Sequence, residues 1–354
     1  MSILLPAWLR FGGSGSSSAI TACKGKPTSP SSSSSSITIV EKDDIITSEL
    51  ADAKEEKVQW IIQSIVDTHS NLLKLPHLRP DHAINQLLGN LVTICSEIHD
   101  QEIVTKVLNS TSVQAVLPSL RKICAESESC LELHWAEHIL QGQSPDEVLA
   151  RLRSFPYYDN YEDLTRLELC SILSATHTAP RKVAFIGSGP LPLTSLCLLR
   201  SLKNDAWVKS MTRPHDRSEE EERPPLVLNV DYDEAAISAS LKLSLALGEA
   251  GKGMEFICAE ASSASKDLTE FDVVYMAALV GISQGEKEGI MLEVVNRMRK
   301  GALLVVRSSW GLRTCLYPEV DLATENLLKR LEPCVVVHPY GQVVNSVIVA
   351  RVRG

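Results

Sequence analysis

A hydrophobic strand that runs directly into a glycine turn constrains the fold of this chain more than any other segment. Residues 182–186 (KVAFI) are followed at once by Gly187, Ser188, Gly189 and Pro190. Glycine lets the backbone bend sharply and approach a ligand that a Cβ atom would exclude, and a helix that follows the turn presents free backbone N–H groups. The segment therefore predicts a nucleotide site at a strand–helix junction of an α/β domain.

The remainder of the C-terminal half fits such a domain. From residue 181 onward short apolar stretches alternate with helical patterns, as an α/β fold requires. We expect strands at 183–186, 226–230, 254–258, 273–276, 302–306 and 343–350. The stretches 235–248 and 285–299 predict crossover helices between them.

The N-terminal half has a helical period instead. Between about residues 43 and 177 apolar residues recur at three- and four-residue spacing, with almost no alternation typical of strands. One predicted helix face carries Val58, Ile61, Ile62, Ile65 and Leu72, and a second carries Ile84, Leu87, Leu88, Leu91, Ile94 and Ile98. A further helix begins at Ser144, because Ser144 can cap a free N–H, Pro145 needs none, and Glu147 can complete a capping box.

Composition limits the classes of partner. The net charge is −9 over 354 residues, which argues against a nucleic-acid partner or an anionic membrane surface, since both favour clustered Lys and Arg. No stretch approaches the ~20 apolar residues of a membrane span. The nine cysteines include no CxxC pair and are typical of reduced thiols. We expect a cytoplasmic protein with a small-molecule substrate; the sequence is compatible with a homodimer without requiring one.

The first 40 residues differ from the rest. They contain no acidic residue and include a serine run from Ser31 to Ser36. This composition predicts a disordered serine-rich tail over residues 1–40. An organellar transit peptide is the alternative, although such a peptide should contain more arginine than the single Arg10 found here.

The residue after the glycine turn distinguishes between kinds of nucleotide. A dinucleotide-binding turn places a third glycine where this chain has Pro192, so a pyrophosphate ligand is disfavoured. The next predicted strand ends at Asp231, which can accept hydrogen bonds from a ribose diol, whereas Asp233 suits a helix N-cap better. These features favour S-adenosylmethionine or a related nucleoside.

The tips of the later strands complete the same crevice. The third strand ends at Ala259 and Glu260, whose carboxylate can meet an adenine amino group. The fourth ends in small apolar residues that leave room for a ligand, among them Ala277 and Leu279. The predicted nucleoside-binding residues are therefore Gly187, Ser188, Gly189, Pro190, Asp231, Ala259, Glu260, Ala277 and Leu279.

One predicted helix carries candidates for metal binding and for proton transfer. His134 and His138 lie one turn apart and could bind a metal, but no third ligand is evident, so we expect no metal site. Glu128 and Glu132 also lie one turn apart and share a face. When two carboxylates lie this near each other, their repulsion raises the pKa of one of them, and a raised pKa suits proton acceptance from an amine.

A tyrosine cluster supports the second interpretation. Tyr157, Tyr158 and Tyr161 lie within five residues of a chain that has only seven tyrosines. Tyrosine combines an apolar ring with a hydrogen-bonding tip, which suits the binding of a cationic ligand and the positioning of its amine. One of the three can equally be explained by core packing.

At these residues the chain resembles the nicotianamine synthase family of plants, fungi and some archaea. The resemblance covers about residue 41 to the C-terminus, and the GSGPLPL turn at 187–193 is its most specific motif. The matching segments are Ala125–Glu132, Phe155–Tyr161, Val183–Ser195, Asp272–Gly281, Gly301–Ser308 and His338–Arg351.

This resemblance implies a fold and a reaction. The expected fold is a Rossmann-like, methyltransferase-type S-adenosylmethionine-binding domain over residues 179–354, preceded by an α-helical domain over 41–178 that carries catalytic residues. Family members use S-adenosylmethionine as a substrate and transfer its 3-amino-3-carboxypropyl arm rather than its methyl group. They join three such units, one closed into an azetidine ring, and release methylthioadenosine. The product chelates metals; the enzyme is expected to need no metal or other cofactor.

The resemblance also implies roles for individual residues. Glu132 and Tyr158 are assigned to proton transfer, with Glu128 and Tyr157 as the nearby alternatives for a register that differs by one helical turn. Arg307 is a candidate for bidentate binding of substrate carboxylates, and its alternative role is a structural ion pair. Tyr161, Tyr317 and Asn345 are also expected to contact substrate.

Three features depart from the plant members of the family. Trp310 stands where a histidine is expected after the Arg-Ser segment at 307–308. An acidic loop at 218–222 and the serine-rich tail are extra. A transferase acting once or twice on another amino acid, and an ordinary methyltransferase, are the alternative functions.

Overall fold

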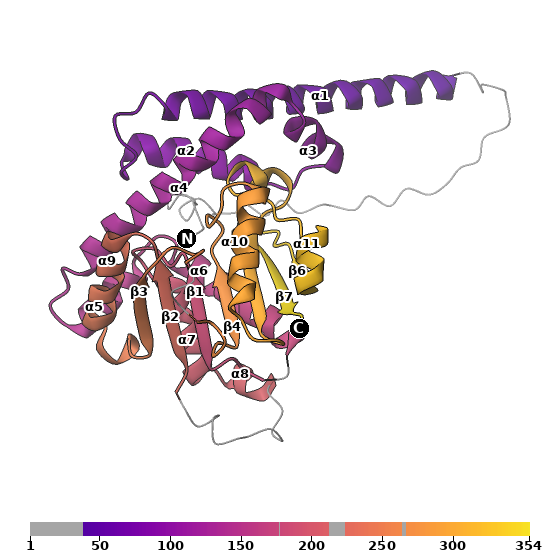
Figure 1. The fold of residues 1–354 in the computed structure, drawn as a ribbon. Coiled ribbons are helices and arrows are strands. Elements are labelled where there is room, and N and C mark those ends of the chain that lie inside the picture. Colours follow the sequence, from indigo (N-terminus) through magenta and orange to yellow (C-terminus); the bar gives the residue numbers. More distant parts are fainter. Residues whose placement is uncertain (1–37, 177, 212–223, 264–266) are drawn as a thin grey trace, which may run out of the picture.

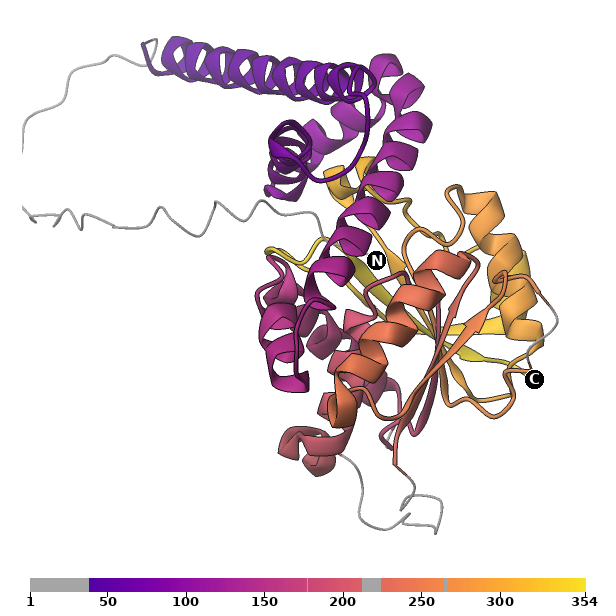
Figure 2. The same cartoon turned by 90° about the vertical axis from the view of Figure 1, so that its left-hand side faces the viewer.

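A layer of helices lies above a block formed by one sheet and its flanking helices (Figure 1). This computed structural model describes residues 38–176, 178–211, 224–263 and 267–354. The upper layer contains α1 (Thr38–Leu72), α2 (His82–Ser96), α3 (Gln101–Leu108) and α4 (Thr111–Ile139). Helix α4 descends from this layer to the sheet, which makes it the link between the two parts (Figures 1 and 2).

Local capping explains where several of these helices begin. The Asp81 carboxylate accepts a hydrogen bond from the backbone N–H of Ile84 at the start of α2. At the start of α5 (Pro145–Arg153), Ser144 accepts from the N–H of Glu147, and the Glu147 carboxylate accepts from the N–H of Gln143. The predicted start of this helix and the Ser144 cap are thus confirmed, whereas Glu147 accepts from the residue before the cap rather than from Ser144 itself.

The apolar faces predicted for α1 and α2 are buried or partly buried, with one exception. Val58, Ile61 and Ile65 of α1 are buried together with Leu88 and Leu91 of α2. The exception is the residue predicted to end the second face. Helix α2 ends at Ser96 and the chain turns toward the next helix, so Ile98 is 70% exposed and its assignment to the buried face was wrong.

The block beneath contains a seven-stranded sheet in the order β3-β2-β1-β4-β5-β7-β6. Its first five strands are parallel, whereas β7 runs antiparallel to both β5 and β6. The parallel strands bring their carboxyl ends to one edge, where ligands bind in open α/β sheets. The strands are β1 (Lys182–Ile186), β2 (Leu226–Asp231), β3 (Met254–Cys258), β4 (Val273–Met276), β5 (Leu303–Ser308), β6 (Leu331–Val337) and β7 (Ser346–Val352).

Helices cover both faces of the sheet. The face toward α6 and α7 buries the side chains of Val183, Phe185 and Val305, whereas the face toward α10 buries Val274 and Val306. The covering helices are α6 (Tyr158–Ala175), α7 (Leu193–Asn204), α8 (Ala206–Met211), α9 (Glu234–Ala246), α10 (Gln284–Asn296) and α11 (Glu325–Arg330), with short 3₁₀ turns η4 (Gly248–Ala250) and η5 (Gly311–Cys315).

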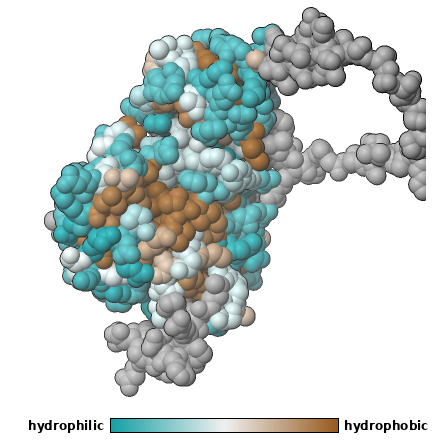
Figure 3. Space-filling model, turned by 90° about the vertical axis from the view of Figure 1, so that its right-hand side faces the viewer, coloured by the Kyte–Doolittle hydropathy of each residue, from teal (hydrophilic) through white to brown (hydrophobic). Residues whose placement is uncertain are grey.

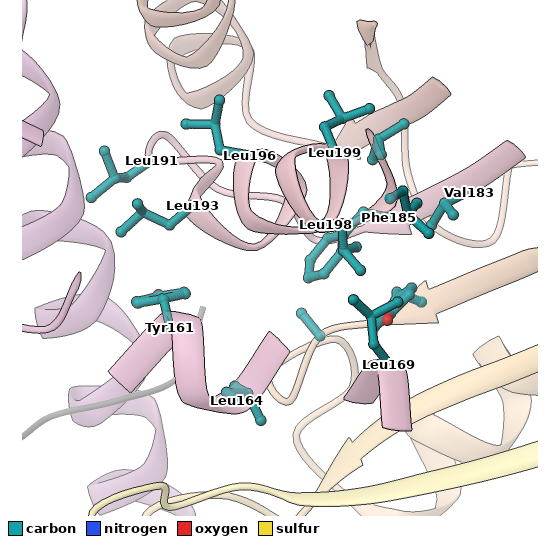
Figure 4. Close-up of a cluster of buried hydrophobic side chains, with 14 of the residues drawn as sticks. Tyr161, Leu164, Leu169, Val183, Phe185, Leu191, Leu193, Leu196, Leu198 and Leu199 are labelled. Carbon is teal, nitrogen blue, oxygen red and sulfur yellow. The ribbon is translucent and has the colours of Figure 1, made fainter. Parts of the chain in front are cut away.

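Helix α6 is integral to the core of the sheet although it precedes β1 in the sequence. Figure 4 shows Tyr161, Leu164 and Leu169 of α6 across from Leu193 and Phe185, and all of them belong to one buried cluster. The helical region and the sheet therefore share a hydrophobic core at this helix. The predicted domain boundary near residue 178 stays a prediction.

The predicted fold class is confirmed, and one strand was missed. All six predicted strands form, within about four residues at their ends. The seventh, β6, contains Glu332 and Pro333 and lies at the edge of the sheet, where Val336 is 50% exposed. Its sequence lacks the continuous apolar pattern of a buried strand, because proline and charge are tolerated at an edge.

The side of the molecule that carries β6 and α11 also shows an apolar surface patch (Figure 3). None of the helices in the described part of the chain is both long and apolar enough to span a membrane. Most of the predicted tail at 1–40 and the whole of the acidic loop at 218–222 lie outside the described residues.

Candidate active site

The glycine turn is held by the strands on either side of it. Gly187 and Gly189 have φ angles of +79° and +68°, a region that favours glycine. The N–H groups of Gly187 and Ser188 donate to the carbonyl oxygen of Val230 at 2.8 and 3.2 Å. A Cβ atom at Gly187 would lie 2.5 Å from the side chain of Val280, so only glycine fits there.

Asp231 ties the turn to the second strand. Its carboxylate accepts a hydrogen bond from the N–H of Gly189 at 2.8 Å and another from the N–H of Asp233 at 3.1 Å. The predicted N-cap role of Asp233 is confirmed, because its own carboxylate accepts from the N–H of Ala235. A carboxylate has about four acceptor positions, so Asp231 retains capacity for a ribose diol beside the turn.

A cavity of about 610 Å³ opens at the carboxyl ends of β1 to β4. This volume is typical of a site for a nucleoside-sized ligand. Eight of the nine predicted nucleoside-binding residues line it: Gly187, Gly189, Pro190, Asp231, Ala259, Glu260, Ala277 and Leu279. Ser188 does not line it, because this residue is buried beneath the turn and its hydroxyl has no partner among the described residues.

One wall of the cavity was not predicted. Lys122, Ala125, Glu126 and Ser129 of α4 face the strand ends across the cavity. Their spacing of three and four residues places them on a single helix face, so the sequence did contain the pattern that groups them. It was missed because the direction in which that face points depends on how α4 packs over the sheet.

Two further residues of α4 face a buried polar region. Glu132 is 1% exposed, and the hydroxyl of Tyr161 from α6 donates to its carboxylate at 2.7 Å. Burial raises the pKa of Glu132 to about 7, the Glu128 and Asp231 carboxylates act in the same direction, and the hydrogen bond from Tyr161 opposes them. Burial and the same two glutamates raise the pKa of Tyr161 well above 10, so it remains a donor.

Glu128 lies one helical turn before Glu132 and has a tyrosine partner of its own. It is 2% exposed, and the hydroxyl of Tyr317 donates to it at 3.1 Å. Burial, followed by the charge of Glu128, raises the pKa of Tyr317 well above its usual value. The two carboxylates predicted to share a face are therefore both buried, and each accepts a hydrogen bond from a buried tyrosine.

Arg307 at the end of β5 forms a buried ion pair. Its Nε and Nη2 donate to the two oxygens of Glu168 at 2.7 and 3.2 Å, and Nη2 also donates to Thr194 at 2.8 Å. Burial opposes its charge, but Glu168 outweighs that effect and raises the pKa of Arg307. Its third nitrogen, Nη1, has no partner among the described residues. The guanidinium is thus oriented by Glu168 and keeps one edge for another acceptor.

The buried polar groups interact electrostatically with one another and with the glycine turn. Asp231 at the glycine turn acts on the pKa of Glu132, and Arg307 acts on that of Tyr161. Asn345, just before β7, is 0% exposed and has no partner for either side-chain polar atom in the described part of the chain. Its position two residues before Val347 puts it on the sheet face that also carries Arg307.

The structure does not pair Tyr158 with Glu132. The hydroxyl of Tyr158 accepts a hydrogen bond from Arg200 of α7 at 3.0 Å, and the same guanidinium binds Glu162. Tyr158 is the first residue of α6, and positions three apart on a helix differ in direction by about 60°. In this structure the hydroxyl bonded to Glu132 is that of Tyr161, and the assignment of Tyr158 to proton transfer stays a prediction from the sequence.

Tyr157 contacts an aromatic neighbour. It packs edge-on against Phe155 and borders a small cavity together with Ser127 and Leu131. His138, one of the two candidate metal ligands, packs edge-on against Trp135 at 5.3 Å between ring centres, and His134 is exposed. Among the described residues no three His, Cys, Asp or Glu side chains cluster as a metal site.

Comparison with known proteins gives consistent relatives. The family model "Nicotianamine synthase protein" matches residues 53–354. Nicotianamine synthase 2 of Oryza sativa subsp. japonica is 34% identical over 303 residues, which cover 85% of each chain. Nicotianamine synthase 2 of Arabidopsis thaliana is 33% identical over 295 residues, covering 83% of this chain and 84% of the relative.

A solved structure shares the fold. The crystal structure of MtNAS in complex with MTA and tNA matches with a TM-score of 0.62, 22% identity and coverage of 84% of this chain and 98% of that chain. A second crystal structure of MtNAS, in complex with S-adenosylmethionine, also has a TM-score of 0.62, at 23% identity. At this identity the likeness shows that the two chains share an architecture.

Proposed function

Because the chain belongs to the nicotianamine synthase family, we propose that it condenses three molecules of S-adenosylmethionine into nicotianamine and releases three of methylthioadenosine. The observation that carries this proposal is the position of the Glu132–Tyr161 pair. Glu132 follows Ser129 by three residues on α4, and Ser129 lines the nucleoside-sized cavity, so the buried pair lies about one helical turn from the cavity wall.

The cavity side supplies recognition of the nucleoside. In this proposal the adenosine part lies against the turn and the strand ends, with its ribose diol on Asp231 and its adenine near Glu260. The sulfonium then points toward α4, which brings its carbons near Glu132. Which of the three sulfonium carbons reacts depends on which one faces the incoming amine in line at about 3–3.5 Å.

The proposed transfer breaks one bond and forms another. The amine nitrogen of the acceptor attacks the side-chain methylene carbon bonded to sulfur. The carbon–sulfur bond breaks, and its electron pair stays on sulfur, which leaves as the neutral thioether of methylthioadenosine. A neutral amine is needed as the nucleophile, and the nitrogen must lose a proton overall. The azetidine ring closes when the amine of one unit attacks the methylene carbon of that same unit while this carbon is still bonded to sulfur, and the carbon–sulfur bond breaks to release methylthioadenosine.

Glu132 is the proposed proton acceptor. With a pKa raised by burial to about 7, its carboxylate can take a proton from an ammonium near neutral pH, where an ordinary glutamate is a much weaker base. Tyr161 holds the carboxylate in place and stabilises its charged form. Glu128 with Tyr317 is a second pair of the same kind, available as the growing acceptor changes position.

Arg307 and Asn345 are the proposed partners of the acceptor's carboxylates. The free Nη1 edge of Arg307 and the unpartnered amide of Asn345 are buried donors on one sheet face. A carboxylate is the acceptor that such donors favour, because charge-assisted hydrogen bonds are stronger than neutral ones. None of these steps assigns a role to a metal.

Mass spectrometry of the products tests the proposal. Purified protein incubated with S-adenosylmethionine alone should form methylthioadenosine and nicotianamine in a ratio of three to one, with or without a metal chelator. Appearance of S-adenosylhomocysteine would contradict the proposal, since it would show methyl transfer. Turnover that requires an added amino acid would indicate a transferase that acts on another acceptor.

A further inference from the structure

Lys287 on α10 is a buried lysine that does not belong to the buried polar groups described above. It is 0% exposed, and its ammonium nitrogen donates to the carbonyl oxygens of Ala277 at 3.2 Å and Ala278 at 2.5 Å. Burial lowers the pKa of Lys287 to about 7, and no acidic side chain in the described part of the chain forms an ion pair with it. A buried amine without an acidic partner is costly to keep, so its two carbonyl contacts call for an explanation.

Both carbonyls belong to the segment that leaves β4 at the cavity. Ala277 continues the β4 pairing by donating its N–H to Ile186, the last residue of β1. Its carbonyl also accepts the N–H of Val280 at 3.2 Å, which closes a turn. Ala277, Leu279, Val280, Gly281 and Ile282 all line the cavity, so this turn forms one wall of the site.

The backbone of Lys287 supports the same wall from behind. Gly281 has a φ angle of +77°, and a Cβ atom there would lie 2.8 Å from the Cα and nitrogen atoms of Lys287. The carboxylate of Glu286 holds the next position by accepting the N–H of Ile282. The first turn of α10 therefore fixes the wall through the Lys287 ammonium, the Lys287 backbone and Glu286.

We propose that Lys287 is a positioning residue that holds the 277–281 wall in the shape that accepts the adenosine part of the substrate. The wall packs directly on the glycine turn, because a Cβ atom at Gly187 would meet both Val280 and Ala277. A shift of the wall would thus change the space around the nucleoside while leaving Glu132, Arg307 and Asn345 in place. This inference rests on the proposed function for the identity of the nucleoside.

The test compares two ligands that occupy different parts of the site. Lys287→Met keeps the length and apolar stem of the side chain but cannot donate a hydrogen bond. Isothermal titration with methylthioadenosine should show binding weakened roughly tenfold, the loss expected for a buried hydrogen-bonded group. Binding of nicotianamine should change less than about twofold, and KM for S-adenosylmethionine should rise more than kcat falls.

A matched control and a second variant keep the test decisive. Lys329→Met on α11 removes an exposed lysine and should leave both dissociation constants unchanged. Lys287→Gln keeps a hydrogen-bond donor, now an amide, and should weaken methylthioadenosine binding less than Lys287→Met does. If Lys287→Met does not fold, Lys287→Gln is the variant to measure. Equal weakening of both ligands, or no weakening of methylthioadenosine binding, would overturn the proposal. A wild-type protein that binds methylthioadenosine but makes no nicotianamine would instead overturn the proposed function.

Discussion

The two halves of the site are built by opposite means. The half at the glycine turn consists of backbone, small residues and short segments next to one another in the sheet, and the N–H groups of its turn have partners. The other half consists of buried charged and phenolic side chains drawn from α4, α6, η5 and its following residues, β5 and the start of β7. Several of its polar atoms, such as Nη1 of Arg307, have no partner among the described residues.

The difference separates recognition from chemistry. The turn half accepts a ligand through shape and backbone groups, and such a surface suits many nucleosides equally well. The polar half keeps raised pKa values and unused donors, which are costly unless a substrate uses them. We therefore expect changes in the polar half to affect rate or stability, and changes in the turn half to affect affinity.

The largest expected effect follows from removing the proton acceptor. Glu132→Gln keeps the size of the side chain and the contact to Tyr161 but cannot accept a proton from an amine. We expect nicotianamine formation to fall by about 10³-fold, within the range typical of general base catalysis, while methylthioadenosine binding changes little. Glu137→Gln, an exposed neighbour on the same helix, is the control. Undiminished turnover of Glu132→Gln would contradict the assignment of the chemistry to the polar half of the site.

Breaking the buried ion pair should cost stability rather than affinity for the nucleoside. Glu168→Gln leaves Arg307 charged and without its counterion, so we expect the free energy of unfolding in urea to drop by about 3–5 kcal/mol. Glu162→Gln on the same helix breaks a partly exposed pair with Arg200 and should cost less than about 1 kcal/mol. Similar losses for both variants would show that the Glu168–Arg307 pair is not special.

The turn half is tested at its tightest point. Gly187→Ala adds a Cβ atom 2.5 Å from Val280 at a backbone angle that favours glycine, so we expect KM for S-adenosylmethionine to rise roughly 10- to 100-fold. Gly301→Ala is a matched control, because Gly301 has a φ angle of +84° and open space around it. If both variants raise KM alike, backbone strain rather than the shape of the cavity is responsible.

The pH dependence should report on the polar half alone. Glu132 is protonated below its raised pKa of about 7, so kcat/KM should rise roughly tenfold between pH 6 and pH 8 while methylthioadenosine binding stays level. The folded state binds more protons than the unfolded chain between pH 4.5 and about 7, so this group's contribution to the free energy of unfolding falls as pH rises through that window. A flat rate profile would contradict the assignment of Glu132.

The smallest expected difference distinguishes two neighbouring tyrosines. Tyr161→Phe removes the donor to Glu132 and should lower kcat several-fold, with its pH midpoint moved upward, because that hydrogen bond lowers the pKa of Glu132. Tyr158→Phe removes a contact to Arg200 and should change kcat by less than about twofold. The reverse order of effects would instead support the role in proton transfer that the sequence assigns to Tyr158.

Sequence patterns predicted the turn half almost completely. The strand, the two glycines, Asp231 and the small residues after β4 lie in contiguous segments, and parallel strands bring such segments to one edge by rule. The exceptions are Ser188, which is buried and does not line the cavity, and the wall that α4 contributes, which depends on how this helix packs. Pro192 in place of a third glycine also separated a nucleoside from a dinucleotide without any three-dimensional information.

The polar half could be predicted as a set of residues but not as pairs. Glu128, Glu132, Arg307 and Tyr317 were named from the sequence, yet the partner of each depends on how helices pack. The local sequence gives no sign that Glu168 belongs to the site, because a single acidic residue within a helix is usually solvated. Its burial opposite Arg307 results from the packing of α6 on the sheet, which no local pattern encodes. The edge strand β6 was missed for the related reason that its environment, rather than its composition, makes it a strand.

The packing of α6 on the sheet has a consequence for how the chain folds. Tyr161, Leu164 and Leu169 of α6 lie in the same core as Phe185 and Leu193 (Figure 4). Strand β1 therefore cannot complete its hydrophobic contacts until α6, which precedes it in the chain, has packed against it. We expect the N-terminal helical region and the sheet domain to unfold in one cooperative transition rather than in succession. A fragment that begins after residue 178 would expose this core, so it should aggregate rather than persist as an independent nucleoside-binding module.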